Sequence, residues 1–184
     1  MHLTQRATLR RLIAEPGSHA CVNEVYDFIG EKDMITCAEI MTQDPQFCVP
    51  YSMCSDVAKT MRDYNVGPIP VVDAADTMHL LGIVTDRDLA VRVMASNKNS
   101  SRTPIAEIMT THPVACKKTD DVQRALKLME DCQVRRLPVV DEQLRLIGII
   151  SQADIATRLH DPKMTAHLVE EISDKEPNNP HVVP

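Results

Sequence analysis

Two short segments carry residue types that could bind a phosphorylated sugar. Gly82–Asp88 reads GIVTDRD and Gly148–Asp154 reads GIISQAD, so each places a hydroxyl residue three positions before an aspartate. This spacing is typical of a helix start, where the hydroxyl and the carboxylate cap backbone N–H groups. Free N–H groups and a hydroxyl also attract phosphate, while a carboxylate accepts from ribose hydroxyls. The segments alone leave both interpretations open.

Both segments belong to a longer internal repeat. EIMT and PVVD each occur twice, 68 residues apart in both cases (Glu39 to Glu107, Pro70 to Pro138). The offset falls to 66 for the two glycine-led segments, because the second copy has lost two residues from a turn, where hairpins tolerate a length change. A repeat of this kind indicates one structural unit used twice.

Each copy predicts the order strand, helix, strand, strand, helix. The first strands are expected near 46–49 and 114–117, and Pro70 and Pro138 should open the second strands, since proline is confined to strand starts and edges. The following helix of the second copy should begin with a capping box formed by Asp120 and Gln123. Its inward face should consist of Val122, Ala125, Leu126, Met129 and Cys132.

A copy of about 60 residues buries too little apolar surface to be stable alone. We therefore expect an α/β fold of the α+β type, in which the two copies pack as a pseudo-two-fold pair around one shared core. Clefts between such repeats are common sites for small ligands. We divide the chain into a helical N-terminal extension (1–34), two repeats (35–97 and 98–160) and a C-terminal helix with a tail (161–184). Within the extension, helices are predicted at Thr4–Glu15 and Asn23–Gly30.

Composition excludes several classes of protein. The chain has 184 residues, 43% of them hydrophobic, and a net charge of −6 with 3% aromatic residues, which disfavours a nucleic-acid partner. Without a long apolar run or a signal peptide, we predict no membrane association and a cytoplasmic location. The six cysteines form no close pair and are interpreted as reduced core thiols, and the histidines lack metal-ligand spacing. No catalytic constellation is visible, so we predict a protein that is not an enzyme and holds no metal.

The order of these motifs resembles a tandem pair of CBS (cystathionine beta-synthase) domains, a Bateman module, over 35–159. The resemblance implies binding of AMP, ADP, ATP or S-adenosylmethionine between the repeats, as a regulatory ligand rather than an obligatory cofactor. By motif, Asp88 and Asp154 become ribose ligands, and Thr85 and Ser151 approach the phosphate.

The resemblance also implies ligand contacts from the segments that precede the first and second strands of each copy. These residues are Thr42, Pro45, Gly67, Pro68, Thr110, Thr111, His112, Pro113, Arg135 and Arg136. Adenine needs an apolar slot, for which Ile83 and Ile149 are candidates. Some members, including the gamma subunit of AMP-activated protein kinase, direct an arginine at phosphate from the position of Arg136. Its counterpart is Pro68, so the two halves should differ in anion affinity.

Acidic residues add a second difference between the halves. Asp86 and Asp88 lie at one expected helix start, whereas Gln152 and Ala153 precede Asp154 at the other. Repulsion of a polyphosphate should therefore be weaker at the Ser151 helix start.

The preferred function is a sensor that signals in trans, as a homodimer or through an unidentified protein partner. The first alternative is a scaffold without a ligand, for homodimerisation or another protein interaction, whose hydroxyl and carboxylate groups only cap helices. The second is a thiol or metal sensor, suggested by the cysteine count and by Cys48 and Cys116, which match in the repeat.

Overall fold

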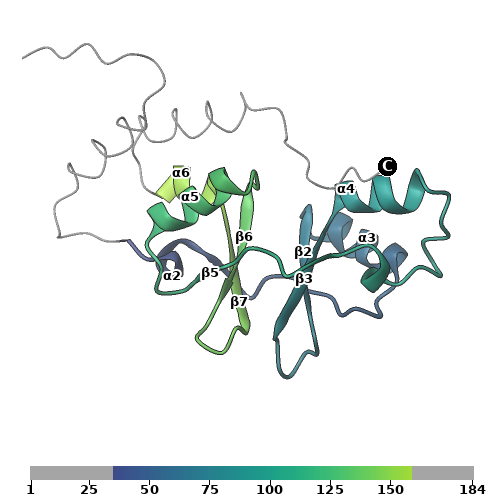
Figure 1. Cartoon of the computed structure of the whole chain (residues 1–184), viewed down its shortest axis with the longest axis horizontal. Helices are drawn as coiled ribbons and strands as arrows, with labels where there is room; N and C mark the ends of the chain where they lie inside the picture. The colour runs from purple at the N-terminus through teal and green to yellow at the C-terminus, as the bar shows by residue number, and fades with distance from the viewer. Residues whose placement is uncertain (1–34, 159–184) are drawn as a thin grey trace, which may run out of the picture. The chain divides into compact units, whose positions relative to one another are not determined.

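Each copy of the repeat folds into a β-hairpin with helices packed on it (Figure 1). The computed structural model describes residues 35–158. The predicted helices of the N-terminal extension and of the C-terminal segment lie outside the described residues. The elements of the first copy are α3 (Cys54–Asp63), β2 (Pro68–Val72), β3 (Leu80–Thr85), α4 (Asp86–Asp88) and the π-helical segment η1 (Leu89–Met94). Those of the second copy are β5 (Cys116–Lys117), α5 (Val122–Asp131), β6 (Arg136–Val140), β7 (Leu146–Ser151) and α6 (Gln152–Arg158).

The two EIMT segments exchange places between the copies. The first contributes α2 (Cys37–Ile40) and β1 (Thr42–Gln43), and β1 pairs antiparallel with β7 of the second copy. The second contributes η2 (Ile105–Glu107) and β4 (Thr110–Thr111), and β4 pairs antiparallel with β3 of the first copy. The resulting sheets have the orders β1-β7-β6-β5 and β2-β3-β4. Each sheet therefore includes a strand from the other copy of the repeat.

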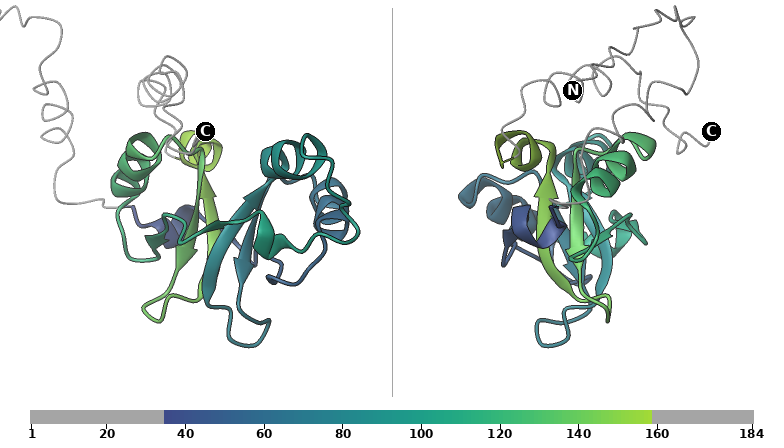
Figure 2. Two further views of the ribbon diagram at one scale, coloured as in Figure 1. Left: turned by 45° about the vertical axis from the view of Figure 1, so that its right-hand side comes forward. Right: turned by 90° about the vertical axis from the view of Figure 1, so that its left-hand side faces the viewer.

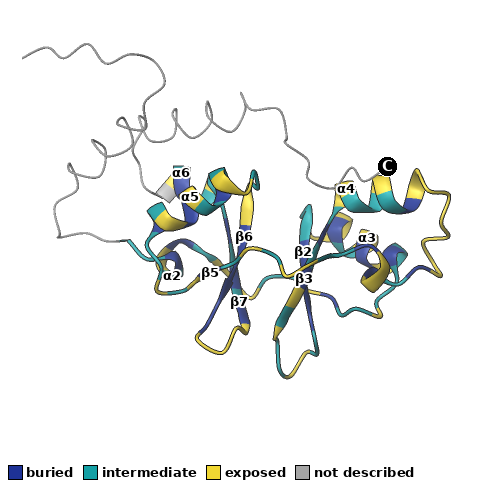
Figure 3. Cartoon of the chain, viewed as in Figure 1, coloured by how far each residue is buried: buried dark blue, intermediate teal, exposed yellow. Residues whose placement is uncertain are grey.

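The buried side chains form two clusters, so the expectation of one shared core is wrong. One cluster gathers around β6, β7 and α5 and includes Cys37 and Ile40 of the exchanged α2. The other gathers around β2, β3 and α3 and includes Ile105 of η2. Helices cover each sheet on its own side (Figure 2), and the strands β2 and β6 are mostly buried (Figure 3). The halves are joined by exchange of segments instead of by a common interior.

The glycines of the two glycine-led segments make this exchange possible. A Cβ atom on Gly82 would lie 2.9 Å from the carbonyl oxygen of Thr110 in β4. A Cβ atom on Gly148 would lie 2.5 Å from Sδ of Met41 and 3.1 Å from the carbonyl oxygen of Thr42 in β1. Real Cβ atoms essentially never come within 3.0 Å of a backbone atom, so glycine is required at position 82 for β4 to approach, whereas at position 148 the contact with β1 would be tight and the Met41 side chain would have to move.

The turns of the two hairpins are bound to each other. The amide of Leu80 donates to the carbonyl of Leu144 (3.2 Å), and the amide of Leu146 donates to that of Met78 (2.8 Å). Met78 and Leu144 are equivalent in the repeat and both have positive φ (57° and 60°). This conformation is unfavourable for these side chains, and the hydrogen bonds across the junction hold them in it.

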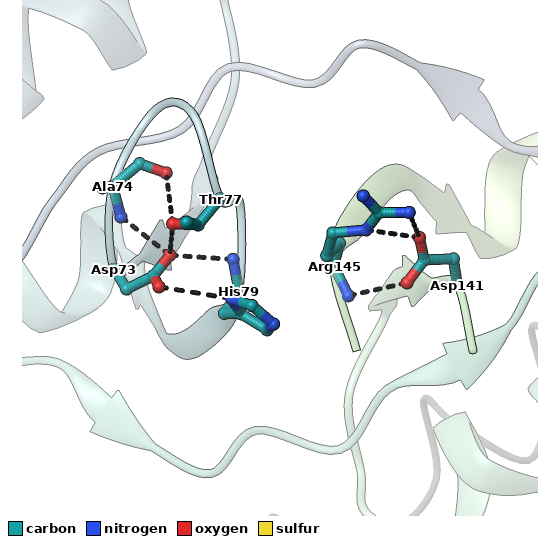
Figure 4. Close-up of polar contacts among 6 residues, drawn as sticks. All are labelled: Asp73, Ala74, Thr77, His79, Asp141 and Arg145. Atoms are coloured by element: carbon teal, nitrogen blue, oxygen red, sulfur yellow. Dashed lines mark hydrogen bonds and ion pairs between the residues drawn. The ribbon is translucent and has the colours of Figure 1, made fainter. Parts of the chain in front are cut away.

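Each hairpin turn is organised by an aspartate from the PVVD motif (Figure 4). Asp73 accepts from the Thr77 hydroxyl (2.7 Å) and from backbone amides, and these bonds lower the pKa of its carboxyl group. Asp141 is paired with the Arg145 guanidinium (2.7 Å) and accepts from the amide of Arg145 (2.9 Å). Burial alone would raise the pKa of Asp141, but the bonds from Arg145 outweigh it and the pKa is lowered.

Four local predictions were wrong, and the first is the strand expected at 46–49, where the structure has only an isolated bridge between Cys48 and Val71. Helix α5 is capped by Asp121, which accepts from the amide of Gln123 (2.8 Å), whereas Asp120 accepts from the amide of Lys117. Cys132 follows the last turn of α5 and is exposed, since the helix ends before its position would face inward. Pro70, in place of opening β2, lies in its middle.

The position of Pro70 has a simple explanation. Its carbonyl accepts from the amide of Cys48 (3.0 Å). The nitrogen and the carbonyl of one residue in a strand point to the same side. The nitrogen of Pro70 therefore faces the Cys48 segment and not β3. The missing N–H group costs the β2–β3 pairing no hydrogen bond. The equivalent Pro138 likewise lies within β6. Across the described part of the chain, no helix has the length and apolar character needed to cross a membrane.

Candidate functional site

The two hydroxyl–carboxylate pairs form closely similar capping boxes. At the start of α4, Asp88 Oδ2 accepts from the Thr85 hydroxyl (2.7 Å) and the Thr85 amide (2.9 Å), and the Asp88 amide donates back to Thr85 Oγ1 (3.2 Å). At the start of α6, Asp154 Oδ2 accepts from the Ser151 hydroxyl (2.6 Å) and amide (2.9 Å). The hydroxyl and carboxylate residues therefore do cap the helix starts.

Capping does not exhaust the binding capacity of these carboxylates. A carboxylate has two oxygens with about four lone-pair sites, and the capping box occupies Oδ2 alone. The second oxygen of Asp88 faces the Arg92 Nε at 3.4 Å, and the Asp88 side chain is 17% exposed. The cap thus fixes the orientation of an oxygen that can still accept from a ligand hydroxyl.

The strands place both helix starts at one end of the hairpins. Thr85 pairs with Pro68 at the start of β2, and Ser151 pairs with Arg136 at the start of β6. The helices are tied to the residues before these strands as well. The amide of Asp86 donates to the carbonyl of Gly67 (3.2 Å), and that of Gln152 donates to the carbonyl of Arg135 (3.1 Å).

Arg136 reaches from the second half to the first. Its Nη1 lies 3.5 Å from the position a Cβ atom on Gly67 would take, and Asp86 Oδ2 lies 3.5 Å from the same position. Arg136 is exposed and forms no ion pair with any residue of the described range 35–158. Its charge therefore offsets the more acidic of the two helix starts, which the sequence pattern did not reveal.

The threonine of each EIMT segment lies beside an isoleucine expected to contact adenine, and this isoleucine belongs to the other copy of the repeat. Thr110 pairs with Ile83, and Thr42 pairs with Ile149. Thr111 pairs with Gly82 in the same way. Each candidate site therefore combines the helix start of one copy with the threonine segment of the other, a consequence of the exchange that sequence reasoning missed.

The residues after these threonines repeat a turn with positive φ. His112 (51°) and its equivalent Asp44 (49°) are both left-handed, and the prolines Pro113 and Pro45 follow them. The amide of His112 donates to the carbonyl of Leu81 (3.1 Å), while its side chain is exposed. The turn thus directs the chain from the added strand toward the next element.

One buried polar group next to Ser151 has no hydrogen-bond partner within residues 35–158. The Nε2 atom of Gln152 is buried and finds no hydrogen-bond partner among the described residues. Its equivalent in the first half is Asp86, whose Oδ1 accepts from the amide of Arg87 (2.8 Å). A buried amide donor without an acceptor is unfavourable by about 1–3 kcal/mol and would be satisfied by a bound acceptor.

The cysteines and acidic residues do not assemble a metal site in the part of the chain that the structure describes. Cys48 and Cys116, which match in the repeat, lie in different clusters. Cys37, Cys48, Cys54 and Cys116 are buried thiols, as predicted, and Cys21 lies outside the described residues.

Exchanged strands, twin hairpins and twin capped helix starts define a duplicated α/β module with two related candidate sites. The CBS domain family model matches residues 37–95 and 105–161, one match for each copy. The chain belongs to the CBS domain family and contains a tandem CBS pair.

Individual relatives agree with this assignment. The chain is 41% identical to YlbB of Bacillus subtilis over 118 residues, which are 64% of this chain and 78% of YlbB. It is similar to the structure of CBSX2 of Arabidopsis thaliana in complex with AMP (25% identity, TM-score 0.58, 67% of this chain and 95% of that one). It is also similar to the CBS pair of MJ0100 in complex with 5′-methylthioadenosine and S-adenosyl-L-methionine (26% identity, TM-score 0.61, 69% and 97%). The matched relatives include proteins of which the CBS-pair region of this chain spans most of the length, and this agrees with the prediction of a regulatory protein instead of an enzyme.

Proposed function

We propose that the protein is a regulatory module that binds an adenosine-containing ligand, AMP, ADP, ATP or S-adenosylmethionine, between its CBS repeats. The observation that carries the proposal is the approach of the exposed Arg136 guanidinium to the helix start at Asp86. A capped carboxylate, Asp88, lies on that same helix and can accept from a ribose. The complexes of CBSX2 with AMP and of MJ0100 with S-adenosyl-L-methionine support this class of ligand.

The two halves offer different surroundings to a ligand. The first combines Arg136 with the carboxylates Asp86 and Asp88, whereas the second has Gln152, with its unsatisfied amide, beside Asp154. An arginine suits a phosphate, because the guanidinium presents paired donors to two oxygens. We infer that a phosphate-bearing ligand contacts Arg136.

Isothermal titration with AMP, ADP, ATP and S-adenosylmethionine tests the proposal. Arg136→Gln should weaken binding of the phosphate-bearing ligands about tenfold or more, the value of one hydrogen bond to a charged group, and leave S-adenosylmethionine unchanged. Arg102→Gln removes another exposed arginine and should leave the affinities for the phosphate-bearing ligands and for S-adenosylmethionine unchanged. Asp88→Asn and Asp154→Asn keep an acceptor for the cap. Each should weaken the binding of every adenosine ligand at its own site.

The scaffold is the second candidate, and the complete capping boxes favour it. Absence of heat and of a thermal shift with all four ligands would support the scaffold and refute the sensor. In either case we propose a homodimer that acts in trans on a protein partner, since Val91 and Met94 of η1 are 52% and 75% exposed. Sedimentation with and without ligand measures the assembly.

A further inference from the structure

An arginine on η1 connects the candidate site at Asp88 with the exchanged segment of the second copy. Arg92 lies four residues after Asp88, and its Nε atom is 3.4 Å from Asp88 Oδ1. Its Nη1 atom donates to the main-chain carbonyl of Ile108 (2.6 Å). Ile108 directly follows η2, so this bond crosses from the first copy of the repeat to the second. One guanidinium therefore contacts both copies.

The Asp88 carboxylate is held from two sides. The capping box occupies Oδ2 through the hydroxyl (2.7 Å) and the amide (2.9 Å) of Thr85. Arg92 faces Oδ1, the oxygen that remains for a ligand hydroxyl. The Asp88 side chain is 17% exposed and that of Arg92 is 40% exposed, so solvent and salt screen this pair only in part. The orientation of Oδ1 thus depends on Arg92 as well as on the cap.

The carbonyl that Arg92 binds belongs to a well-packed part of the exchanged segment. Ile108 is buried in the cluster around β2 and β3. Two residues later the chain enters β4, where Thr110 pairs with Ile83 at the same candidate site. A guanidinium presents its donors in a fixed planar fork. Arg92 therefore fixes Asp88 relative to the segment that brings Thr110 to the site.

Local structure and the internal repeat both single out Arg92. η1 is a π-helix, in which the amide of Ala95 donates to the carbonyl of Ala90, five residues earlier (3.0 Å). Such segments are rare and occur frequently at functional sites. Within 85–92, the second copy keeps the same residue only at the positions of Asp88, Ala90 and Arg92. An aspartate followed by an arginine four residues later is thus present in both copies.

We propose that Arg92 is a positioning residue for the candidate site at Asp88. It holds the Asp88 carboxylate in place relative to η2 and β4, so that both parts of the site are oriented before an adenosine-containing ligand binds. A site that is already ordered spares the free energy of ordering it on binding. The inference rests on the function proposed above, because it assigns Arg92 a part in binding that class of ligand.

Titration with AMP and with S-adenosylmethionine tests the proposal. The full chain carries Asp154→Asn, which weakens the second site and leaves the site at Asp88 to be measured. Arg92→Gln should raise the Kd for both ligands about three- to tenfold, within the range of coupling between residues in contact. Both ligands are affected because Arg92 acts on the carboxylate that accepts from the ribose. A loss confined to AMP would indicate a direct contact with phosphate and would overturn the proposal.

A double-mutant cycle shows whether Arg92 acts through Asp88. When Asp88→Asn is already present, the further change Arg92→Gln should alter the Kd by less than about twofold. An undiminished effect in that background would contradict the proposal. Arg92→Lys keeps the charge but replaces the fork with a single ammonium group, so it should bind both ligands as weakly as Arg92→Gln. Wild-type affinity in Arg92→Lys would show that charge alone suffices, and the positioning role would be wrong.

Lys98→Gln is the matched control. Lys98 Nζ pairs with Glu107 Oε2 of η2 (2.9 Å), so this variant also removes a contact with η2. Within the described range 35–158, no hydrogen bond or ion pair joins Lys98 to Asp88. The Kd values should therefore stay at those of the background. A loss as large as that of Arg92→Gln would mean that the attachment of η2 matters and the contact with Asp88 does not.

Hydrogen exchange without ligand separates failure of this inference from failure of the proposed function. The amide of Thr85 donates to Asp88 Oδ2, and the amide of His112 donates to the carbonyl of Leu81, so they report on the helix start and on β4. Both amides should lose protection in Arg92→Gln. If the wild type binds neither ligand, the proposed function fails, while loss of protection at both amides still supports the positioning of Asp88. Unchanged protection at both amides would refute that positioning, whatever the wild type binds.

Discussion

Replacement of Gly82 by alanine should destabilise the protein through the exchanged strand β4. The new Cβ atom would lie 2.9 Å from the Thr110 carbonyl oxygen and 3.0 Å from Sδ of Met109. The Met109 side chain can rotate away, but the Thr110 carbonyl belongs to the backbone of β4. Relief of the clash therefore requires that β4 move away from β3.

The size of the effect can be bounded from two opposing contributions. Overpacking of this kind costs about 1–3 kcal/mol. Alanine in a strand recovers about 0.5–1 kcal/mol relative to glycine, because the unfolded chain has less freedom to lose. The free energy of unfolding should therefore fall by about 1 kcal/mol, and by no more than about 2.5 kcal/mol.

Urea unfolding and hydrogen exchange together test this reasoning. The amide of His112, which donates to the Leu81 carbonyl (3.1 Å), should lose protection when β4 moves. Gly67→Ala is the matched control, because its Cβ would meet Arg136 and Asp86 at 3.5 Å, an ordinary contact, and stability should be unchanged or slightly higher. If Gly82→Ala and Gly67→Ala prove equally stable, the steric explanation of the glycine is wrong.

Two further predictions concern the hairpin turn and the helix cap. The lowered pKa of Asp141 means that its bonds to Arg145 contribute stability above about pH 4, which is lost as the pH falls through the folded-state pKa. Between pH 6 and pH 2 the Tm of the wild type should fall more steeply than the Tm of Asp141→Asn. Parallel curves of Tm against pH would contradict this. Thr85→Ala removes the acceptor for the Asp88 amide and should cost about 1 kcal/mol in urea unfolding, whereas Thr119→Ala, at an exposed threonine, should cost nothing measurable.

The repeat made most of the fold predictable, because each hairpin and helix is specified locally. The β-branched runs after Pro70 and Pro138 and the apolar spacing of α5 predicted the correct elements. The exchange of β1 and β4 was not predictable in this way. A two-residue strand has almost no periodicity, and its choice of partner depends on contacts with Gly82 and Gly148 that are distant in sequence.

The candidate site was predictable in its parts but not in its assembly. The spacing of Thr85 and Asp88 indicated the capping box, and the sequence marked Arg136 as a difference between the halves. Its placement beside Gly67 and Asp86 depends on how the hairpins pack, which no local pattern encodes.

The exchange of β1 and β4 has a consequence for how such a chain could arise. A single copy of the repeat supplies a strand that its own sheet does not use, and lacks the strand that its sheet requires. Two separate copies could complete each other by the same exchange, as a symmetric domain-swapped dimer. Joining them end to end would leave every pairing intact and would free each half to change independently. Arg136, which matches Pro68, and Cys37, which matches Ile105, are differences of this kind, and a symmetric dimer of identical chains could not have held them at one site alone.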